Sequence, residues 1–251
     1  KNKKSLGQNF IFDKNFLKKI SNFIETNSDN TLIEIGPGPG TLTEFLYKKK
    51  FKKLILIEKD SRLILKLKKN FFSNKTDIFN IDALSFDFQH NDLNNSIIVG
   101  NLPFNISVDL LYLWTKLKKW PPNQVKMVLM FQKEVANRIM ADPNNKSYGK
   151  LSIVIQSRYR INKLLDVQSK LFTPPPKVDG VILEFIPHND YRLIDIDKID
   201  KVSKSAFSQR RKKIKNNMIK YIEILDILSI DTNLRPENLS VSDYCEIAKN
   251  I

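Results

Sequence analysis

The ten residues TLIEIGPGPG, at positions 31–40, join a short apolar run to a glycine-rich turn, and a helical pattern begins at Thr41 or Leu42. A continuous apolar run of this length is typical of a strand buried on both faces of a sheet. Glycines at a strand-to-helix turn let the backbone approach a ligand closely, at the carboxyl end of the sheet where open α/β folds bind ligands. An NAD site fits poorly, because the dinucleotide motif has a third Gly or Ala where this chain has Thr41 and seldom has prolines between its glycines.

Alternating strands and helices continue this pattern along the chain. Helical patterns separate four further apolar runs, which lie at residues 54–57, 78–81, 97–99 and 127–131. The alternation predicts an α/β fold, in which helices cover both faces of a parallel sheet. Residues 151–159 fit a helix or a strand, because periodicity does not distinguish the two. Residues 178–186 alternate apolar and polar side chains after a proline cluster, which predicts an edge strand.

The composition is that of a soluble globular protein. Of the 251 residues, 41% are hydrophobic and 27% are charged, which excludes disorder throughout. The apolar runs are far shorter than the roughly 20 residues that span a bilayer, which excludes a membrane protein. One cysteine, Cys245, and two histidines, His90 and His188, cannot build a disulfide framework or a Cys/His metal site. We therefore expect a protein without a metal, located in the reducing cytoplasm.

The charge is strongly positive, with 42 Lys+Arg against 27 Asp+Glu and a net charge of +15. A lysine-coated surface is one interpretation, and a polyanionic partner such as nucleic acid is the other. After Pro187 the apolar strand runs give way to helical periodicity, so we predict two domains, at residues 1–188 and 189–251. Residues 201–220, in the second domain, contain basic side chains and no acidic one. This segment favours a nucleic-acid partner, and its candidate phosphate ligands are Arg210, Arg211 and Lys212.

Acidic side chains follow two of the predicted strands. Glu58 ends the run at residues 54–57, where an acidic side chain in Rossmann-like folds accepts hydrogen bonds from both ribose hydroxyls. Asp82 ends the next run, where a carboxylate can accept a hydrogen bond from an adenine amine. Each acid alone is typical of a solvated strand end. Glycines, Glu58 and Asp82 at three successive strand ends together predict a site for an adenosine-bearing cofactor.

The most specific feature follows the fourth strand, where the chain reads Asn101-Leu102-Pro103-Phe104. An amine conjugated to an adenine ring is a poor nucleophile, because its lone pair is delocalised into the ring. The Asn101 side-chain oxygen and a backbone carbonyl at Leu102 or Pro103 could accept its two N–H bonds and favour a more pyramidal nitrogen. Pro103 stiffens the turn, and Phe104 offers a face on which an unstacked base can lie. The alternative is a proline turn with a buried Phe.

With these motifs in place, the chain resembles the ribosomal RNA adenine N6-dimethyltransferases, a family related to the erythromycin-resistance methylases. The resemblance covers essentially the whole chain. The matching motifs are KSLGQNF (4–10), EIGPG (34–38), DA (82–83), NLPF (101–104), QKEV (132–135), YGKLS (148–152), FTPPPKVD (172–179) and AFSQRRK (206–212).

This resemblance implies a Rossmann-like class I methyltransferase core that uses S-adenosylmethionine, followed by a small C-terminal helical domain. The implied cofactor site consists of Asn9, Ile11, Gly36, Gly38, Glu58, Asp82, Ala83 and Asn101. The family positions that match Asn101, Leu102 and Phe104 also hold the target adenine, and the one that matches Phe172 closes on it from the opposite face. Many relatives carry Tyr in place of Phe104, which removes a hydroxyl from this chain but leaves the stacking surface.

The implied reaction is dimethylation of N6 of two adjacent adenosines in a hairpin near the 3′ end of small-subunit (16S) ribosomal RNA, coupled to ribosome assembly. The expected partner is that RNA or the pre-small-subunit particle, and we expect the protein to be a monomer. Two alternatives remain. One is a DNA adenine N6-methyltransferase, because the loop after the fourth strand is shared with enzymes that flip adenine out of duplex DNA. The other is a ribosome-assembly factor that binds RNA without turnover.

Overall fold

The computed structural model describes residues 9–251, which separate into two compact units. Unit 1 contains the described residues up to 114 together with 122–133 and 162–186. Unit 2 contains 115–121, 134–161 and 187–251. The last crossing between the units, after Ile186, lies close to the predicted domain boundary. Unit 2 also includes two earlier segments, which a division into 1–188 and 189–251 does not separate, so that division remains a prediction about functional domains.

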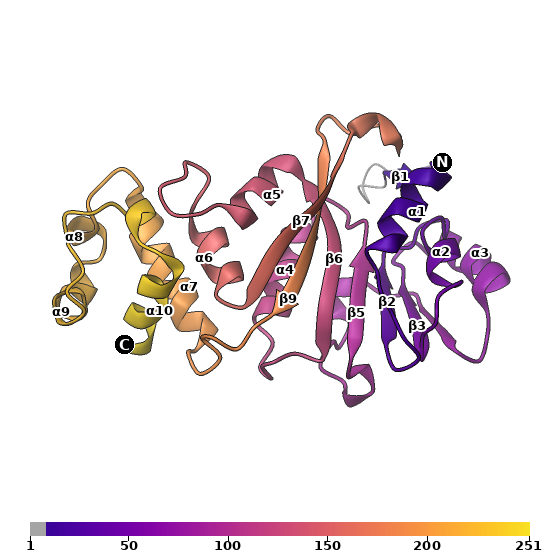
Figure 1. The fold of residues 1–251 in the computed structure, drawn as a ribbon, viewed down its shortest axis with the longest axis horizontal. Helices are drawn as coiled ribbons and strands as arrows, with labels where there is room; N and C mark the ends of the chain where they lie inside the picture. The colour runs from indigo at the N-terminus through magenta and orange to yellow at the C-terminus, as the bar shows by residue number, and fades with distance from the viewer. Residues whose placement is uncertain (1–8) are drawn as a thin grey trace. The chain divides into compact units, whose positions relative to one another are not determined.

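The largest element is a seven-stranded sheet with the order β4-β3-β2-β5-β6-β9-β7 (Figure 1). Its strands are β2 (Thr31–Ile35), β3 (Lys53–Ile57), β4 (Thr76–Phe79), β5 (Ser96–Gly100), β6 (Gln124–Gln132), β7 (Tyr159–Val167) and β9 (Gly180–Pro187). The first five strands in this order are parallel, and β9 is antiparallel to β6. From β2 the chain moves outward to β3 and β4 and then returns to β5 on the other side of β2. This reversal creates a topological switch point, where open α/β sheets bind ligands beyond the carboxyl ends of the strands.

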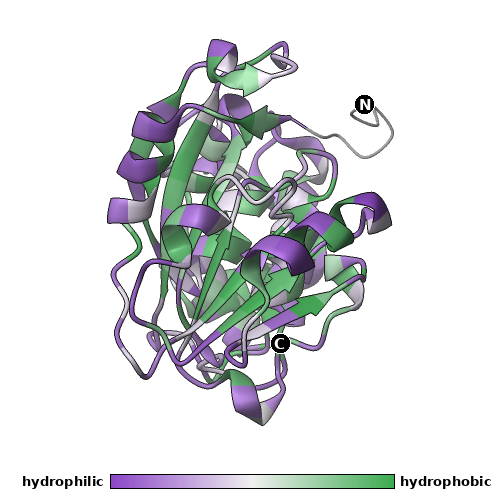
Figure 2. Cartoon of the chain, turned by 90° about the vertical axis from the view of Figure 1, so that its right-hand side faces the viewer, coloured by the Kyte–Doolittle hydropathy of each residue, from purple (hydrophilic) through white to green (hydrophobic). Residues whose placement is uncertain are grey.

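Both faces of the central strands are covered, as the sequence predicts. Every residue of β2 and β5 is buried. On one face, strand residues form a single core with α1 (Lys14–Asn22), α2 (Thr43–Leu46) and α3 (Ser61–Phe71). Alternate strand residues point to the opposite face. In Figure 2 the strands are mostly green, whereas the surrounding helices and loops carry purple segments. The predicted α/β architecture is therefore confirmed in unit 1.

The prediction of an edge strand at 178–186 is wrong. β9 occupies that region but lies between β6 and β7. The polar positions that suggested solvent exposure include Glu184, which forms an ion pair with Lys126 of β6 at 2.8 Å and accepts a hydrogen bond from Asn162 of β7 at 2.9 Å. A polar cluster across three strands therefore produces the alternation that is expected of an edge.

The ambiguous segment at 151–159 forms a helix followed by the start of a strand. Helix α6 (Lys150–Gln156) is buried from Leu151 to Ile155, so it has no polar face that would reveal helical periodicity. The backbone N–H of Gly149 donates to Ser152 Oγ at 3.1 Å, which satisfies one donor at the helix start. Strand β7 follows, and its sequence mixes polar and apolar residues with no apolar run longer than Leu164-Leu165, so it could not be predicted as a buried strand.

The strand predicted at 78–81 begins and ends two residues earlier in the structure, at Thr76–Phe79. β4 ends at Phe79, so Asp82 does not end a strand. Asp82 instead caps a short 3₁₀ helix, η2 (Ala83–Ser85), by accepting the backbone N–H of Leu84 at 3.0 Å. The intervening Asn80 donates through Nδ2 to the backbone oxygen of Glu58 at 2.9 Å. This hydrogen bond ties the turn after β4 to the end of β3.

Unit 2 is helical apart from the first residues of β7 and the last residue of β9. Its α-helices are α5 (Lys133–Met140), α6, α7 (Ile196–Ala206), α8 (Ile214–Asn217), α9 (Ile222–Ile227) and α10 (Val241–Lys249). The rings of Tyr148, Phe207 and Tyr244 pack together in this unit. Among the described residues, no helix is long and apolar enough to cross a bilayer, and no cluster of three His, Cys, Asp or Glu side chains could hold a metal ion.

Candidate functional site

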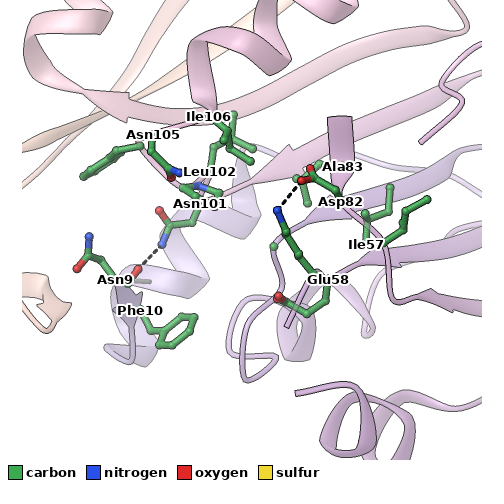
Figure 3. A pocket seen from close by; sticks show the side chains of 16 residues that line it. Asn9, Phe10, Ile57, Glu58, Asp82, Ala83, Asn101, Leu102, Asn105 and Ile106 are labelled. Carbon is green, nitrogen blue, oxygen red and sulfur yellow. Dashed lines mark hydrogen bonds and ion pairs between the residues drawn. The ribbon is translucent and has the colours of Figure 1, made fainter. Parts of the chain in front are cut away.

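A cavity of about 120 Å³ lies beyond the carboxyl ends of β2, β3 and β5, at the switch point (Figure 3). The residues that line it and that the sequence predicts are Asn9, Gly36, Glu58, Asp82, Ala83, Asn101, Leu102, Pro103 and Phe104. Residues that line it without having been predicted are Phe10, Ile35, Ile57, Lys59, Ile81, Asn105 and Ile106. Most of the second group directly precede or follow a predicted residue in the sequence. Proximity along the chain is therefore the signal that could have identified them.

The glycine turn between β2 and α2 requires glycine on two grounds. Gly36 and Gly38 have φ angles of +64° and +58°, a region that other residues rarely adopt. A Cβ atom on Gly38 would also lie 2.4 Å from Cε1 of Phe10. Gly38 does not line the cavity, but its backbone N–H donates to Oε2 of Glu58 at 3.0 Å. The turn thus holds the carboxylate of the next strand end in place.

Glu58 follows β3 directly and is 7% exposed. Its Oε1 accepts the backbone N–H of Asp60 at 2.8 Å, so each carboxylate oxygen has one hydrogen bond from the backbone. Burial raises the pKa of Glu58, and these hydrogen bonds partly oppose that shift. The backbone N–H of Lys59 also contributes a hydrogen bond to the carboxylate. Because a carboxylate has about four acceptor sites, Glu58 keeps acceptor capacity for a ligand hydroxyl. Glu58 can therefore accept a hydroxyl of a ribose.

Asp82 lines the cavity beside Ala83 and pairs with Lys59. The Lys59 Nζ lies 2.7 Å from Oδ2 of Asp82, and Oδ1 is occupied by the Leu84 N–H. The hydrogen bonds from Lys59 and Leu84 hold the pKa of Asp82 below its usual range. Asp82 therefore remains a charged acceptor, and an adenine amine would share Oδ2 with the ammonium group.

The turn after β5 presents its polar atoms to the cavity. Asn101 Nδ2 donates to the backbone oxygen of Asn9 at 3.0 Å (Figure 3). The backbone oxygen of Pro103 accepts the N–H of Ile106 at 3.1 Å. Within residues 9–251, no backbone hydrogen bond to the oxygen of Leu102 is found. Of the two backbone carbonyls that the sequence left open, Leu102 is therefore the better candidate for a ligand.

Two predicted residues outside this cavity belong to a two-stranded ribbon. β1 (Phe10–Ile11) pairs antiparallel with β8 (Phe172–Thr173), and Ile11 is opposite Phe172. Ile11 lines a smaller neighbouring cavity of about 40 Å³. Phe172 is 2% exposed, and its ring contacts the ring of Phe104 edge to face, with centroids 6.3 Å apart. Both residues thus adjoin the larger cavity without lining it.

Glu34, in the middle of β2, is a buried acid that the sequence interpretation did not single out. It lines the smaller cavity, and its Oε2 accepts a hydrogen bond from Oγ1 of Thr43 at 2.6 Å. Burial raises its pKa to about 7. The available signal was a single charged residue within an otherwise apolar strand run.

The three predicted phosphate ligands lie in unit 2, in the turn before α8, and they differ in their contacts. Arg210 Nε lies 2.7 Å from Oε2 of Glu237, and Arg210 also donates to the backbone oxygen of Asn145 at 3.1 Å. These contacts join three segments of unit 2. Arg211 and Lys212 are exposed. Arg210 is therefore anchored within unit 2, and all three residues remain candidates for binding phosphate.

Comparison with known proteins finds sequence matches over the full chain. The model of the family described as ribosomal RNA adenine dimethylase matches residues 1–251. The ribosomal RNA small subunit methyltransferase A of Wigglesworthia glossinidia brevipalpis is 40% identical, over 99% of this chain and 97% of its own length. The protein of the same name from Pelagibacter ubique is 39% identical, over 99% and 96%.

Solved structures show the same fold. A dimethyladenosine transferase from Plasmodium falciparum superposes with a TM-score of 0.82 at 26% identity, covering 96% of each chain. The 23S rRNA methyltransferase ErmE has a TM-score of 0.69 at 18% identity, covering 96% of this chain and 98% of its own, and supports the fold alone. The N-terminal motif is described only at Asn9 and Phe10, since residues 4–8 lie outside the described part. With the family model matched from end to end and relatives at 40% identity, this chain belongs to the ribosomal RNA adenine dimethylase family.

Proposed function

We propose that the protein transfers methyl groups from S-adenosylmethionine to N6 of two adjacent adenosines in a hairpin near the 3′ end of small-subunit ribosomal RNA, as a cytoplasmic monomer that acts during ribosome assembly. The observation that carries the proposal is the turn at 101–104, which lines the same cavity as Glu58. The family description supports adenine as the target base. The names of the relatives support the small ribosomal subunit as the substrate.

The residues of the cavity suit the cofactor. Glu58 keeps acceptor capacity for a ribose hydroxyl, and Asp82 is a charged acceptor for the adenine amine. The glycine turn at Gly36 leaves room for close approach of a ligand to the backbone. When bound, S-adenosylmethionine supplies an activated methyl group.

Asn101 and Leu102 would act on the target amine. The Asn101 side-chain oxygen and the Leu102 carbonyl can each accept one N–H of the amine, which favours the pyramidal nitrogen of the transition state. Because both acceptors are set in a turn stiffened by Pro103, they need little reorganisation during transfer. Positioning and electrostatics of this kind require neither a covalent intermediate nor a side chain that titrates.

Phe104 and Phe172 would hold the base, and their contact implies a movement. A base between two rings needs about 7 Å between the ring planes, since each stacked pair is separated by about 3.5 Å. In the structure the two rings meet edge to face at a centroid distance of 6.3 Å. Phe172 is buried, so Phe104, which is half-buried, is the ring that has to turn.

The test is transfer of labelled methyl groups to small subunits that lack the modification, followed by analysis of the nucleosides. The expected product is N6,N6-dimethyladenosine at two adjacent positions, and Asn101→Ala supplies the inactive control. Parallel reactions with duplex DNA test the DNA alternative, which would be favoured by label in DNA and none in the subunit. A protein that binds the subunit and the cofactor but transfers no label would be an assembly factor instead.

A further inference from the structure

The Asn101 side-chain amide has one defined orientation, because its hydrogen-bond partner is a backbone carbonyl. Its Nδ2 lies 3.0 Å from the backbone oxygen of Asn9. A backbone carbonyl can only accept a hydrogen bond, so the nitrogen of the amide must face it. The side-chain oxygen is then turned away from Asn9. Both residues line the larger cavity, as Figure 3 shows.

The Asn9 carbonyl is itself held in place by the strand that follows it. β1 begins at Phe10 and pairs with β8, and Ile11 is 3% exposed. The Phe10 ring packs so closely against Gly38 that a Cβ there would lie 2.4 Å away. The carbonyl therefore belongs to a backbone that is anchored on both the ribbon and the glycine turn.

We propose that Asn9 is a positioning residue, whose main-chain carbonyl fixes the Asn101 amide so that its oxygen accepts the N–H of the target amine. The inference rests on the proposed function of Asn101. In the opposite orientation the amide would present its NH₂ group to the amine, and two donors cannot form a hydrogen bond. The first strand thus contributes to the transfer step separately from any contact between Asn9 and the cofactor.

Backbone esters test the carbonyl directly. Replacing Phe10 by phenyllactic acid turns the Asn9 carbonyl into an ester carbonyl, which is a weaker acceptor. The matched control replaces Ile11 by its α-hydroxy acid, which alters the same strand but leaves the Asn9 carbonyl as an amide. We expect single-turnover transfer, with RNA and cofactor saturating, to be about five to ten times slower in the first ester than in the second. Cofactor affinity, measured by calorimetry, should agree within about twofold between the two esters.

A side-chain variant gives an independent readout. Asn101→Asp keeps an acceptor oxygen but has no proton to donate to Asn9 when it is ionised. Its protonated form restores the donor, so its rate relative to wild type at the same pH should rise as the pH falls towards the pKa of the new carboxyl. Asn101→Asp as fast as wild type at pH 8 would overturn the inference.

The outcomes separate this inference from the proposed function. Equal transfer rates in the two esters, with Asn101→Ala slow, would overturn the positioning role while leaving Asn101 in the mechanism. Asn101→Ala at full speed would remove Asn101 from the mechanism altogether. A slow first ester, a faster control ester and a low-pH recovery of Asn101→Asp would together establish the positioning role.

Discussion

The sheet edge of unit 1 that lines the larger cavity, and the basic turn of unit 2 at residues 210–212, hold their charged groups in different ways. At the edge, both oxygens of Glu58 accept backbone N–H groups, and Asp82 is held by Leu84 and Lys59. In the basic turn, only Arg210 has such support, and it comes from partners within unit 2. Groups fixed by the backbone suit a reaction that depends on geometry, whereas exposed side chains suit phosphates at variable positions. Within this turn, Arg210 is therefore the best-anchored side chain, whereas Arg211 and Lys212 are the more exposed ones.

The largest effect is expected at the edge itself. Asn101→Ala should lower single-turnover methyl transfer about 100-fold or more, the size of effect seen when one preorganised group at a reacting centre is removed. Cofactor affinity should change much less, since the side-chain oxygen is proposed to act on the amine. Asn105→Ala is the matched control, because Asn105 lines the same cavity without the hydrogen bond to Asn9. Equal loss in both variants would argue against a specific role for Asn101.

The second effect concerns cofactor affinity. Glu58→Ala should weaken S-adenosylmethionine binding by about 1.5–3 kcal/mol, the range for removing a charged acceptor. The variant also leaves the N–H groups of Gly38 and Asp60 without their acceptor, so thermal unfolding is measured alongside. Glu44→Ala, an exposed carboxylate on α2, is the control. Calorimetry that shows unchanged affinity in a folded Glu58→Ala protein would remove Glu58 from the site.

The third effect concerns the stability contributed by Glu34, a buried carboxyl of unit 1. The pKa of Glu34 is about 7 in the folded chain, against 4.5 for the free group. Between these values the folded state binds more protons than the unfolded state, so stability is fully present below pH 4.5 and is lost as pH rises through 7. Between pH 5 and 7 the free energy of unfolding should fall by about 2 kcal/mol more in wild type than in Glu34→Gln. Parallel pH profiles for the two proteins, measured by urea denaturation, would contradict the buried, protonated state.

The smallest effects are expected in the basic turn, where Arg210 should differ from its neighbours Arg211 and Lys212. Arg210→Ala should lower the free energy of unfolding by about 1 kcal/mol, a value reduced by the partial exposure of its ion pair with Glu237. Arg211→Ala with Lys212→Ala should leave unfolding unchanged but weaken RNA binding. The slope of log affinity against log salt should become shallower by about 0.7–0.9 for each phosphate that the double variant no longer binds. An unchanged slope in the double variant would move the RNA-binding role to another basic segment, such as residues 48–53.

Local sequence was sufficient to predict the position of the groups that lie at the ends of buried strands. Gly36, Glu58 and Asn101 could be assigned to one edge because parallel strands with apolar runs end at the same edge of a sheet. The motif at 101–104 carried its chemistry within four adjacent residues. Helix α3 is likewise determined locally, because its apolar residues recur at helical spacing and the Asp60 side chain caps its first turn.

Three-dimensional packing decided the features that depend on residues far apart in the chain. β9 is an internal strand because Glu184 meets Lys126 and Asn162 across its neighbours, which alternation along one strand cannot reveal. Arg210 is anchored because Glu237 and Asn145 lie beside it. The orientation of the Asn101 amide depends on a carbonyl 92 residues earlier. Pattern and propensity are read over a few neighbouring residues, whereas burial, ion pairing and amide orientation depend on partners that only the folded chain brings together.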